Sequence, residues 1–183
     1  MTVADLRQQY PELKDHTLTE PDLITDGEQL AGIADDSQDF VIASHFLEHC
    51  QDPIGAVASM LRVTKANGII YLAIPDKRYT FDRRRPLTTF AHLVHDHTEG
   101  PAISREAHFE EWATLAEDEN IRGRSASELM AIDYSIHFHV WTQAEMLELF
   151  ARLKTDFDFP FDVEAILKNG MELIAVLRKH AGP

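Results

Sequence analysis

The sequence predicts an α/β fold built on a partly parallel sheet. Two unbroken apolar runs, at residues 39–43 and 69–74, have the length and composition of strands inside such a sheet. A helical pattern separates them, and strand, helix and strand in about 35 residues form a right-handed crossover unit with a parallel pair. Two further strand-like segments, 162–167 and 171–177, meet across Asn169-Gly170. This dipeptide predicts a closing antiparallel hairpin.

Composition and charge limit the class of protein. The chain has 183 residues, 44% of them hydrophobic, which suits a single domain over residues 1–183. No apolar run reaches the roughly 18 residues of a membrane span and no secretion signal opens the chain, so we expect a soluble, cytoplasmic protein. The net charge of -14 argues against nucleic-acid binding. The single cysteine, Cys50, excludes an internal disulfide and indicates a buried thiol.

The first 33 residues predict short elements. Thr2 suits a helix N-cap, and Pro11 ends the helical pattern that follows. The apolar pair Leu23-Ile24 lies between turn residues and predicts a short strand. Residues 28–33 fit a brief helical segment.

The crossover unit has clear boundaries. We expect the strand at 39–43 to be buried on both faces of the sheet. Asp52 can cap the next helix, which runs to residue 63, and Asn67-Gly68 predicts the turn that follows it. The second strand, at 69–74, ends at Pro75.

Residues 76–140 are polar, rich in histidine and partly helical. This length exceeds an ordinary connection, so we expect an inserted cap over the edge of the sheet that forms the substrate region. Thr142 and Glu145 then form a capping box that opens an amphipathic helix at 143–153.

One short basic segment lies in an otherwise acidic chain. Residues 76–85 carry a net charge of +3, against -8 for the residues before them and -9 for those after them. Two interpretations remain open, a solvated loop and an anion-binding surface. The basic side chains at issue are Lys77, Arg78, Arg83, Arg84 and Arg85.

Histidine spacing raises the question of a metal. His45 and His49 fit the inverted zinc-protease pattern H-x-x-E-H, in which both imidazoles lie on one helical face. The apolar strand before them places His45 in a strand-to-helix turn instead, so the pattern predicts no metal. Further histidine groups occur in the inserted region, and there we expect solvated or structural side chains: His92 with His95 and His97, and His137 with His139.

Ligands of open parallel sheets bind beyond the carboxyl ends of the strands. Three polar segments of this chain follow apolar strands at that edge, at residues 25–28, 44–49 and 75–78. We therefore expect the functional site to be built from these three turns.

A family resemblance arises from these segments together. The run from Asp26 to Pro86, with its SHFLEH turn, its Asp-Pro helix and its RVTKANGIIYL strand, resembles the middle of class I S-adenosylmethionine-dependent methyltransferases of type 11. The Asn-Gly hairpin is similar to the sixth and seventh strands that close that family's sheet. The family's sheet has the strand order 3-2-1-4-5-7-6, and the resemblance implies that this chain forms a partial Rossmann-like sheet from strands 3 to 7. It also implies a mostly helical insertion after the fifth strand and a C-terminal antiparallel hairpin.

The resemblance also implies a function, which is methyl transfer from S-adenosylmethionine to a small acceptor. The acceptor would be sugar-like or anionic and would lie against the basic segment. His49 is a candidate base, although a structural role at the start of the helix explains it equally well. The implied cofactor-binding residues are Asp26 and Gly27 beside the adenine, and Ser44 and His45 beside the methionine and sugar.

The sequence departs from that family at the cofactor loop. It contains no G-x-G-x-G turn and no second strand ending in an acid, so we expect an N-terminally truncated domain that binds S-adenosylmethionine weakly. The missing strands would leave the strand at 39–43 with an open edge, which favours a homodimer or a complementing chain. Two interpretations remain open: an enzyme that needs its missing N-terminal part, and an inactive methyltransferase-like binding module or gene fragment.

Overall fold

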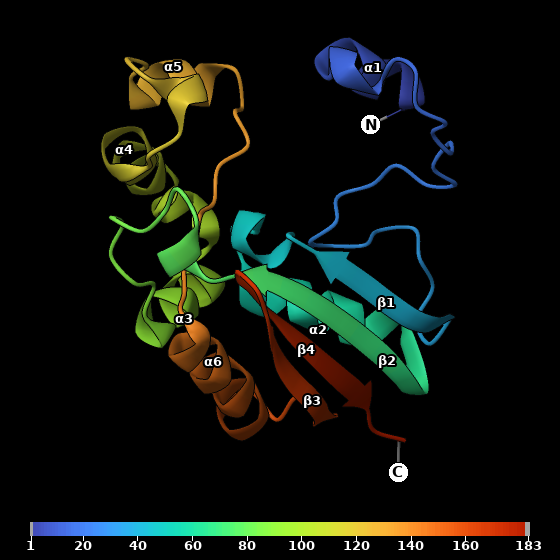
Figure 1. Ribbon diagram of the computed structural model, residues 1–183. Coiled ribbons are helices and arrows are strands. Elements are labelled where there is room, and N and C mark those ends of the chain that lie inside the picture. Colours follow the sequence, from blue (N-terminus) through green and yellow to red (C-terminus); the bar gives the residue numbers. More distant parts are fainter. Residues whose placement is uncertain (1, 182–183) are drawn as a thin grey trace.

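A computed structural model describes residues 2–181 of the chain, the side chain of Gln9 excepted. Its centre is a four-stranded mixed sheet in the order β1-β2-β4-β3 (Figure 1). β1 and β2 are parallel, whereas β4 is antiparallel to both of its neighbours. The order matches the 4-5-7-6 part of the expected sheet and confirms the predicted fold class. The strands are β1 (Gln38–Ser44), β2 (Thr64–Pro75), β3 (Phe161–Asn169) and β4 (Glu172–Lys179).

Helix caps lie where the sequence predicts them. Helix α2 (Pro53–Val63) begins after Asp52, whose Oδ1 accepts a hydrogen bond from the Gly55 amide at 2.9 Å. Helix α6 (Gln143–Asp156) begins with the capping box of Thr142 and Glu145. These side chains satisfy amide groups that have no partner inside a helix, and so fix where each helix starts.

The turn predicted at Asn67-Gly68 is wrong, because β2 continues through it. Asn67 has a φ of 63°, and the β1–β2 register shifts between Gln38 and Phe40. A Cβ at Gly68 would lie 2.8 Å from the Asp39 carbonyl oxygen, so the two backbones approach too closely for a side chain there. The local signal therefore marks an irregularity within the strand rather than its boundary.

Only one face of the sheet is covered within the described residues. The core lies on that face, where Ile70, Leu72 and Leu177 pack against α2, α3 (Phe90–Glu99) and α6. On β1, Phe40 is 61% exposed and Ile42 is 64% exposed. The expectation of a strand buried on both faces is therefore wrong for β1, because its continuous apolar run faces solvent at alternate positions.

The segment before β1 forms less structure than predicted. Helix α1 (Val3–Gln9) has its Thr2 cap and, with the 3-10 turn η1 (Pro11–Leu13), lies apart from the sheet (Figure 1). Leu23-Ile24 is not a strand, since no strand of the described residues pairs with it and its side chains are 48% and 54% exposed. Residues 28–33 form successive turns rather than a helix.

The inserted region divides into two parts. Its first helix, α3, packs on the main core through Phe90 and Leu93, whereas α4 and α5 enclose a separate small core around Phe109 and Trp112. Both ends of the insertion meet at the carboxyl end of β2, where Asp76 pairs with Trp141. The remaining elements are α4 (Arg105–Leu115), α5 (Ala126–Ala131) and the 3-10 turns η3 (Lys77–Tyr79), η4 (Pro101–Ile103) and η5 (Glu119–Ile121).

Candidate functional site

The turn after β1 places a cluster of ionisable side chains at the carboxyl end of the sheet. The His45 amide donates to the Ala73 carbonyl of β2 at 2.9 Å, and His45 itself adopts a φ of 49°. A short 3-10 turn, η2 (Leu47–His49), follows before Asp52 caps α2. This confirms His45 in a strand-to-helix turn, so the two histidines of the H-x-x-E-H pattern do not share a helical face.

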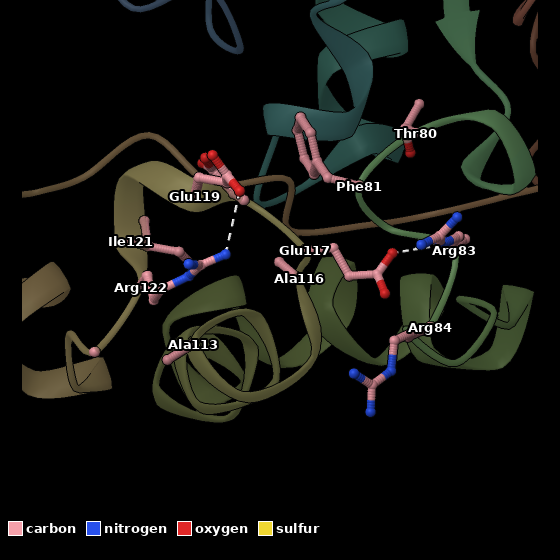
Figure 2. A pocket seen from close by; sticks show the side chains of 12 residues that line it. Thr80, Phe81, Arg83, Arg84, Ala113, Ala116, Glu117, Glu119, Ile121 and Arg122 are labelled. Atoms are coloured by element: carbon pink, nitrogen blue, oxygen red, sulfur yellow. Dashed lines mark hydrogen bonds and ion pairs between the residues drawn. The ribbon is translucent and has the colours of Figure 1, made fainter.

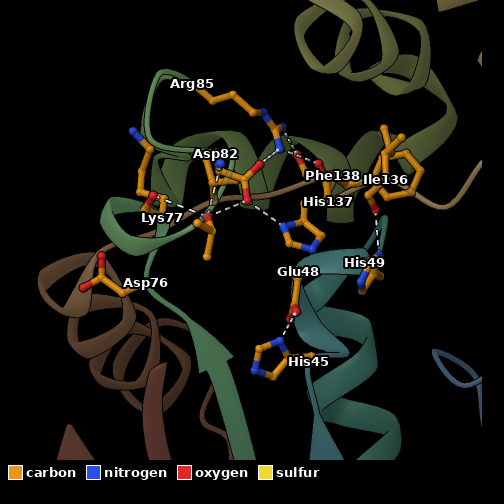
Figure 3. Close-up of polar contacts among 12 residues, drawn as sticks. His45, Glu48, His49, Asp76, Lys77, Asp82, Arg85, Ile136, His137 and Phe138 are labelled. Carbon is orange, nitrogen blue, oxygen red and sulfur yellow. Dashed lines mark hydrogen bonds and ion pairs between the residues drawn. The ribbon is translucent and has the colours of Figure 1, made fainter. Parts of the chain in front are cut away.

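Glu48 is the central side chain of this turn. It is 1% exposed, and neither carboxylate oxygen has a hydrogen-bond partner among the described residues. His45 Nδ1 lies 3.8 Å from Oε1 (Figure 3). Burial raises the pKa of this carboxyl group, although the nearby His137 and His45 oppose the shift. Because a buried unpaired carboxylate is costly, this group signals a functional role more than a structural one.

Two imidazoles, those of His49 and His137, lie close to Glu48. One ring nitrogen each of His49 and His137 lies within 4.8 Å of a Glu48 oxygen, and the two rings meet edge to face at 4.6 Å. His49 Nδ1 lies 2.8 Å from the Ile136 carbonyl oxygen, which makes Nδ1 the donor and leaves Nε2 as the basic nitrogen. Burial lowers the pKa of His49, so its ring is neutral at neutral pH.

His137 is oriented by a buried carboxylate. Its Nδ1 lies 2.7 Å from Asp82 Oδ2, which leaves Nε2 as the basic nitrogen (Figure 3). Burial raises the pKa of Asp82, but His137 and Arg85 outweigh burial and hold that pKa below its usual value. The pair links residues 55 positions apart in the sequence, which is why sequence reasoning did not find it.

The five basic side chains of residues 76–85 have different surroundings. Arg85 does not contribute to an anion-binding surface, because its guanidinium is buried in the insertion and hydrogen-bonded there. It donates to Asp82 Oδ1 at 2.9 Å, to Glu111 Oε1 at 2.8 Å and to the His137 carbonyl at 2.7 Å. The predicted substrate role is therefore wrong for Arg85, whose buried charge holds the insertion together.

The other four basic side chains are exposed or half-buried. Arg78 binds the Asp76 carboxylate through Nε and Nη2, and Lys77 Nζ donates to the Arg83 carbonyl at 3.0 Å. Arg83 forms an ion pair with Glu117. Arg84 is exposed and points away from the Arg83–Glu117 pair (Figure 2).

A cavity of about 710 Å³ lies between the basic segment and the end of α4 (Figure 2). Arg83 and Arg84 line one side, and Phe81 forms part of its wall. The Phe81 ring also contacts the His137 ring, with 4.9 Å between centroids. Phe81 therefore separates the cavity from the group of Glu48, His49 and His137, which we call the Glu48 cluster.

The predicted cofactor residues lie along the open side of the site. Asp26, Ser44 and His45 are exposed, and His45 Nε2 lies 2.8 Å from Glu172 Oε2 of β4. A Cβ at Gly27 would lie 2.7 Å from the Phe46 ring, so a larger residue there would have to displace that ring. Asp26 also lines a hollow of about 310 Å³ with Gln51, Asp52 and their neighbours.

Sequence reasoning missed Glu28, which fixes this edge. Its two carboxylate oxygens accept hydrogen bonds from the amides of Gln51 and Asp52, at 2.8 and 2.9 Å. The segment at 26–28 is thereby tied to the turn that carries Glu48 and His49. A lone acid in a turn gave no signal of a contact 23 residues away.

One family model matches the N-terminal part of the chain. Residues 2–72 match the family model described as a methyltransferase domain. This match covers the N-terminal part of the chain and, with the sheet order, makes that part similar to class I S-adenosylmethionine-dependent methyltransferases. The cofactor of this family is S-adenosylmethionine, and the matched segment contains all four predicted cofactor residues.

Solved structures share the fold at low identity. A Rhodobacter sphaeroides protein, provisionally described as a Zn-dependent alcohol dehydrogenase, matches with a TM-score of 0.55 at 8% identity, over 97% of this chain and 70% of its own. The PH0226 protein of Pyrococcus horikoshii OT3 matches at 16% identity and a TM-score of 0.49, over 97% and 68%. A protein of Listeria monocytogenes, provisionally described as an S-adenosylmethionine-dependent methyltransferase, matches at 14% and 0.49, over 95% and 76%.

No curated protein matches the sequence. The chain spans about two thirds to three quarters of the length of these three structures. Among the described residues, no helix is long and apolar enough to cross a membrane.

The described residues fit S-adenosylmethionine in part. Ser44 and His45 lie at the carboxyl end of β1, and Gly27 lies against the Phe46 ring that follows it. The backbone loop that would hold the methionine and ribose needs closely spaced glycines, and no two of the eight glycines in this sequence lie closer than five positions.

Proposed function

We propose that this methyltransferase transfers the methyl group of S-adenosylmethionine to a small, anionic, sugar-like acceptor. The observation that carries the proposal is the Glu48 cluster. A buried carboxylate without hydrogen-bond partners lies beside two imidazoles whose Nε2 atoms are free to accept a proton. The cluster follows the first strand of a parallel pair, where ligands of such sheets bind.

S-adenosylmethionine supplies an activated methyl group when bound, so this chain has to orient the acceptor and remove its proton. His49 Nε2 is the proposed proton acceptor, because burial keeps its ring neutral. His137 is fixed by Asp82 at 2.7 Å, and its ring contacts the His49 ring. Glu48 stabilises the imidazolium that forms after the proton is taken.

The acceptor would occupy the cavity beside Phe81. Of the three arginines that line it, Arg84 is the one for which the described residues provide no ion pair, and an arginine there suits a phosphate or carboxylate group. In this proposal residues 76–140 form the acceptor-binding cap. Asp26, Gly27, Ser44 and His45 bind the cofactor from the open side of β1.

Methyl transfer from isotope-labelled S-adenosylmethionine tests the proposal. We would supply the cofactor at millimolar concentration and offer sugar phosphates, nucleotide sugars and small carboxylates, with the neutral sugars as controls. Labelled product is expected with an anionic acceptor, and His49→Gln is expected to lower the rate by about 100-fold or more. His95→Gln, at an exposed position of α3, is the matched control and should leave the rate unchanged.

Two outcomes would contradict this assignment. Equal rates for wild type and His49→Gln would remove His49 from the reaction. Tight binding of an acceptor without labelled product would instead favour the inactive binding module. The sequence lacks the closely spaced glycines of a cofactor loop, which would then account for the missing activity.

A further inference from the structure

A second histidine cluster lies in the insertion, apart from the Glu48 site. Helix α3 contributes His92 and Asp96, helix α4 contributes His108, and the segment leading to Trp141 contributes His139. One donor atom from each of the four side chains lies within 4.8 Å of every other. Three separate stretches of chain therefore direct their metal-ligating atoms at one point.

Two atoms of this cluster are buried and unpartnered. Asp96 and His139 are each 0% exposed, and Asp96 Oδ2 and His139 Nδ1 have no hydrogen-bond partner. Asp96 Oδ2 lies 3.1 Å from His92 Nε2 and 3.5 Å from His108 Nε2, without the geometry of a hydrogen bond. Leaving such atoms unpaired costs about 1–3 kcal/mol each, so the arrangement calls for a ligand that satisfies both.

The distances match those between the ligands of a tetrahedral ion. Zn²⁺ bonds of about 2.0–2.1 Å to nitrogen and oxygen place tetrahedral ligand atoms roughly 3.3 Å apart. The separations here are 3.1 Å from His92 Nε2 to His108 Nε2, 3.1 Å from His92 Nε2 to Asp96 Oδ2, and 3.5 Å from His108 Nε2 to Asp96 Oδ2. Two imidazole nitrogens facing each other this closely share at most one proton, whereas an ion would engage both lone pairs.

Outer contacts orient two of these four side chains, Asp96 and His139. The Ser104 hydroxyl donates to Asp96 Oδ1 at 2.5 Å, which leaves Oδ2 for an ion. His139 Nε2 lies 3.3 Å from the Gln51 carbonyl oxygen, so Nε2 carries the proton and Nδ1 is the free lone pair. Metal sites orient their ligands in this way: a ligating histidine donates its other ring N–H to a carbonyl, and a ligating carboxylate accepts a hydrogen bond at its other oxygen.

We propose that His92, Asp96, His108 and His139 bind a divalent transition-metal ion of the Zn²⁺ class. Three imidazoles and one carboxylate close the coordination sphere of such an ion, which makes the site structural rather than catalytic. The ion joins α3, α4 and the segment at residue 139. The His139 amide also donates to the Glu48 carbonyl at 3.2 Å, so the bound ion fixes the insertion against the turn that carries the functional site.

The test is zinc affinity of the full-length, untagged protein, measured in competition with a chromophoric chelator. We expect one zinc ion per chain in wild type. His92→Gln is the informative variant, because this ligand is the least buried of the four and its loss disturbs packing least. It should weaken zinc binding by about 100-fold or more, beyond the 10–100-fold typical of changes to outer contacts.

Two matched variants locate the ion. His95→Gln lies on the same helix at an exposed position and should bind zinc as wild type does. His49→Gln removes a member of the Glu48 cluster, which also offers three ligand atoms, and should likewise keep zinc binding. No zinc binding by wild type, unchanged affinity in His92→Gln, or loss of zinc in His49→Gln would each overturn the proposal.

A measurement on wild type alone covers the case in which His92→Gln does not fold. Cobalt(II) added to the metal-free protein should give the intense visible absorption of a four-coordinate ion, and zinc should abolish it. Removing the ion should also lower the midpoint of thermal unfolding. The weak absorption of six-coordinate cobalt, or an unchanged midpoint, would count against a closed tetrahedral site.

Discussion

Replacing Arg85 by methionine tests whether the insertion depends on one buried cation. The Arg85 side chain is 0% exposed and donates to the carboxylates of Asp82 and Glu111 and to the carbonyls of His137 and Phe138. Arg85→Met keeps much of the volume but leaves Asp82, whose side chain is 2% exposed, without its cation. Breaking a buried ion pair on one side costs about 3–5 kcal/mol.

The expected effect on thermal unfolding follows from that cost. For a chain of this size 1 kcal/mol shifts the midpoint by about 2–4 °C, so Arg85→Met should unfold about 6–20 °C lower. Arg84→Met is the matched control, since Arg84 is the exposed neighbour and should shift the midpoint very little. Differential scanning calorimetry measures both variants. Equal midpoints for Arg85→Met and wild type would refute the role given to this side chain.

Other predictions follow from individual groups. The pKa of Asp82 in the folded protein lies below its unfolded value of about 3.9. The difference in free energy of unfolding between wild type and Asp82→Asn, measured by urea unfolding, should therefore be largest above about pH 3.9 and shrink as the pH falls through the folded pKa. Ile42→Lys should reduce self-association in light scattering, because Ile42 is 64% exposed on the open strand β1; unchanged association would exclude this face. Cys50 is 1% exposed and burial raises its pKa, so a thiol reagent should label it only after unfolding. Calorimetric titration should show no micromolar affinity for S-adenosylmethionine, because the sequence lacks closely spaced glycines.

The fold could be predicted wherever local signals agreed with packing. Asp52 and Thr142 mark helix starts because capping is a local interaction. The strand predicted at Leu23-Ile24 failed because a strand also needs a neighbour, which two apolar residues do not reveal. The exposure of Ile42 could not be predicted either, since an apolar run does not show which faces of the sheet are covered.

The functional site could be predicted only in part. Position beyond a strand end predicted that Ser44, His45 and His49 lie at the carboxyl edge of the sheet, because topology brings strand ends to one edge. The pairing of Asp82 with His137 and the burial of Arg85 depend on how the insertion folds back, which no spacing records. The same reason explains why the metal-ligating group was missed, since its four members come from three separate segments.

The most direct test of the account is a titration of the isotope-labelled protein with S-adenosylmethionine at millimolar concentration, followed by amide NMR. It needs neither tight binding nor a known acceptor. The account predicts shift changes concentrated at Asp26-Gly27 and at residues 44–49, with exposed His95 unaffected. Changes confined to other parts of the chain, or none at saturating cofactor, would contradict the assignment of the carboxyl edge of β1 as the cofactor site.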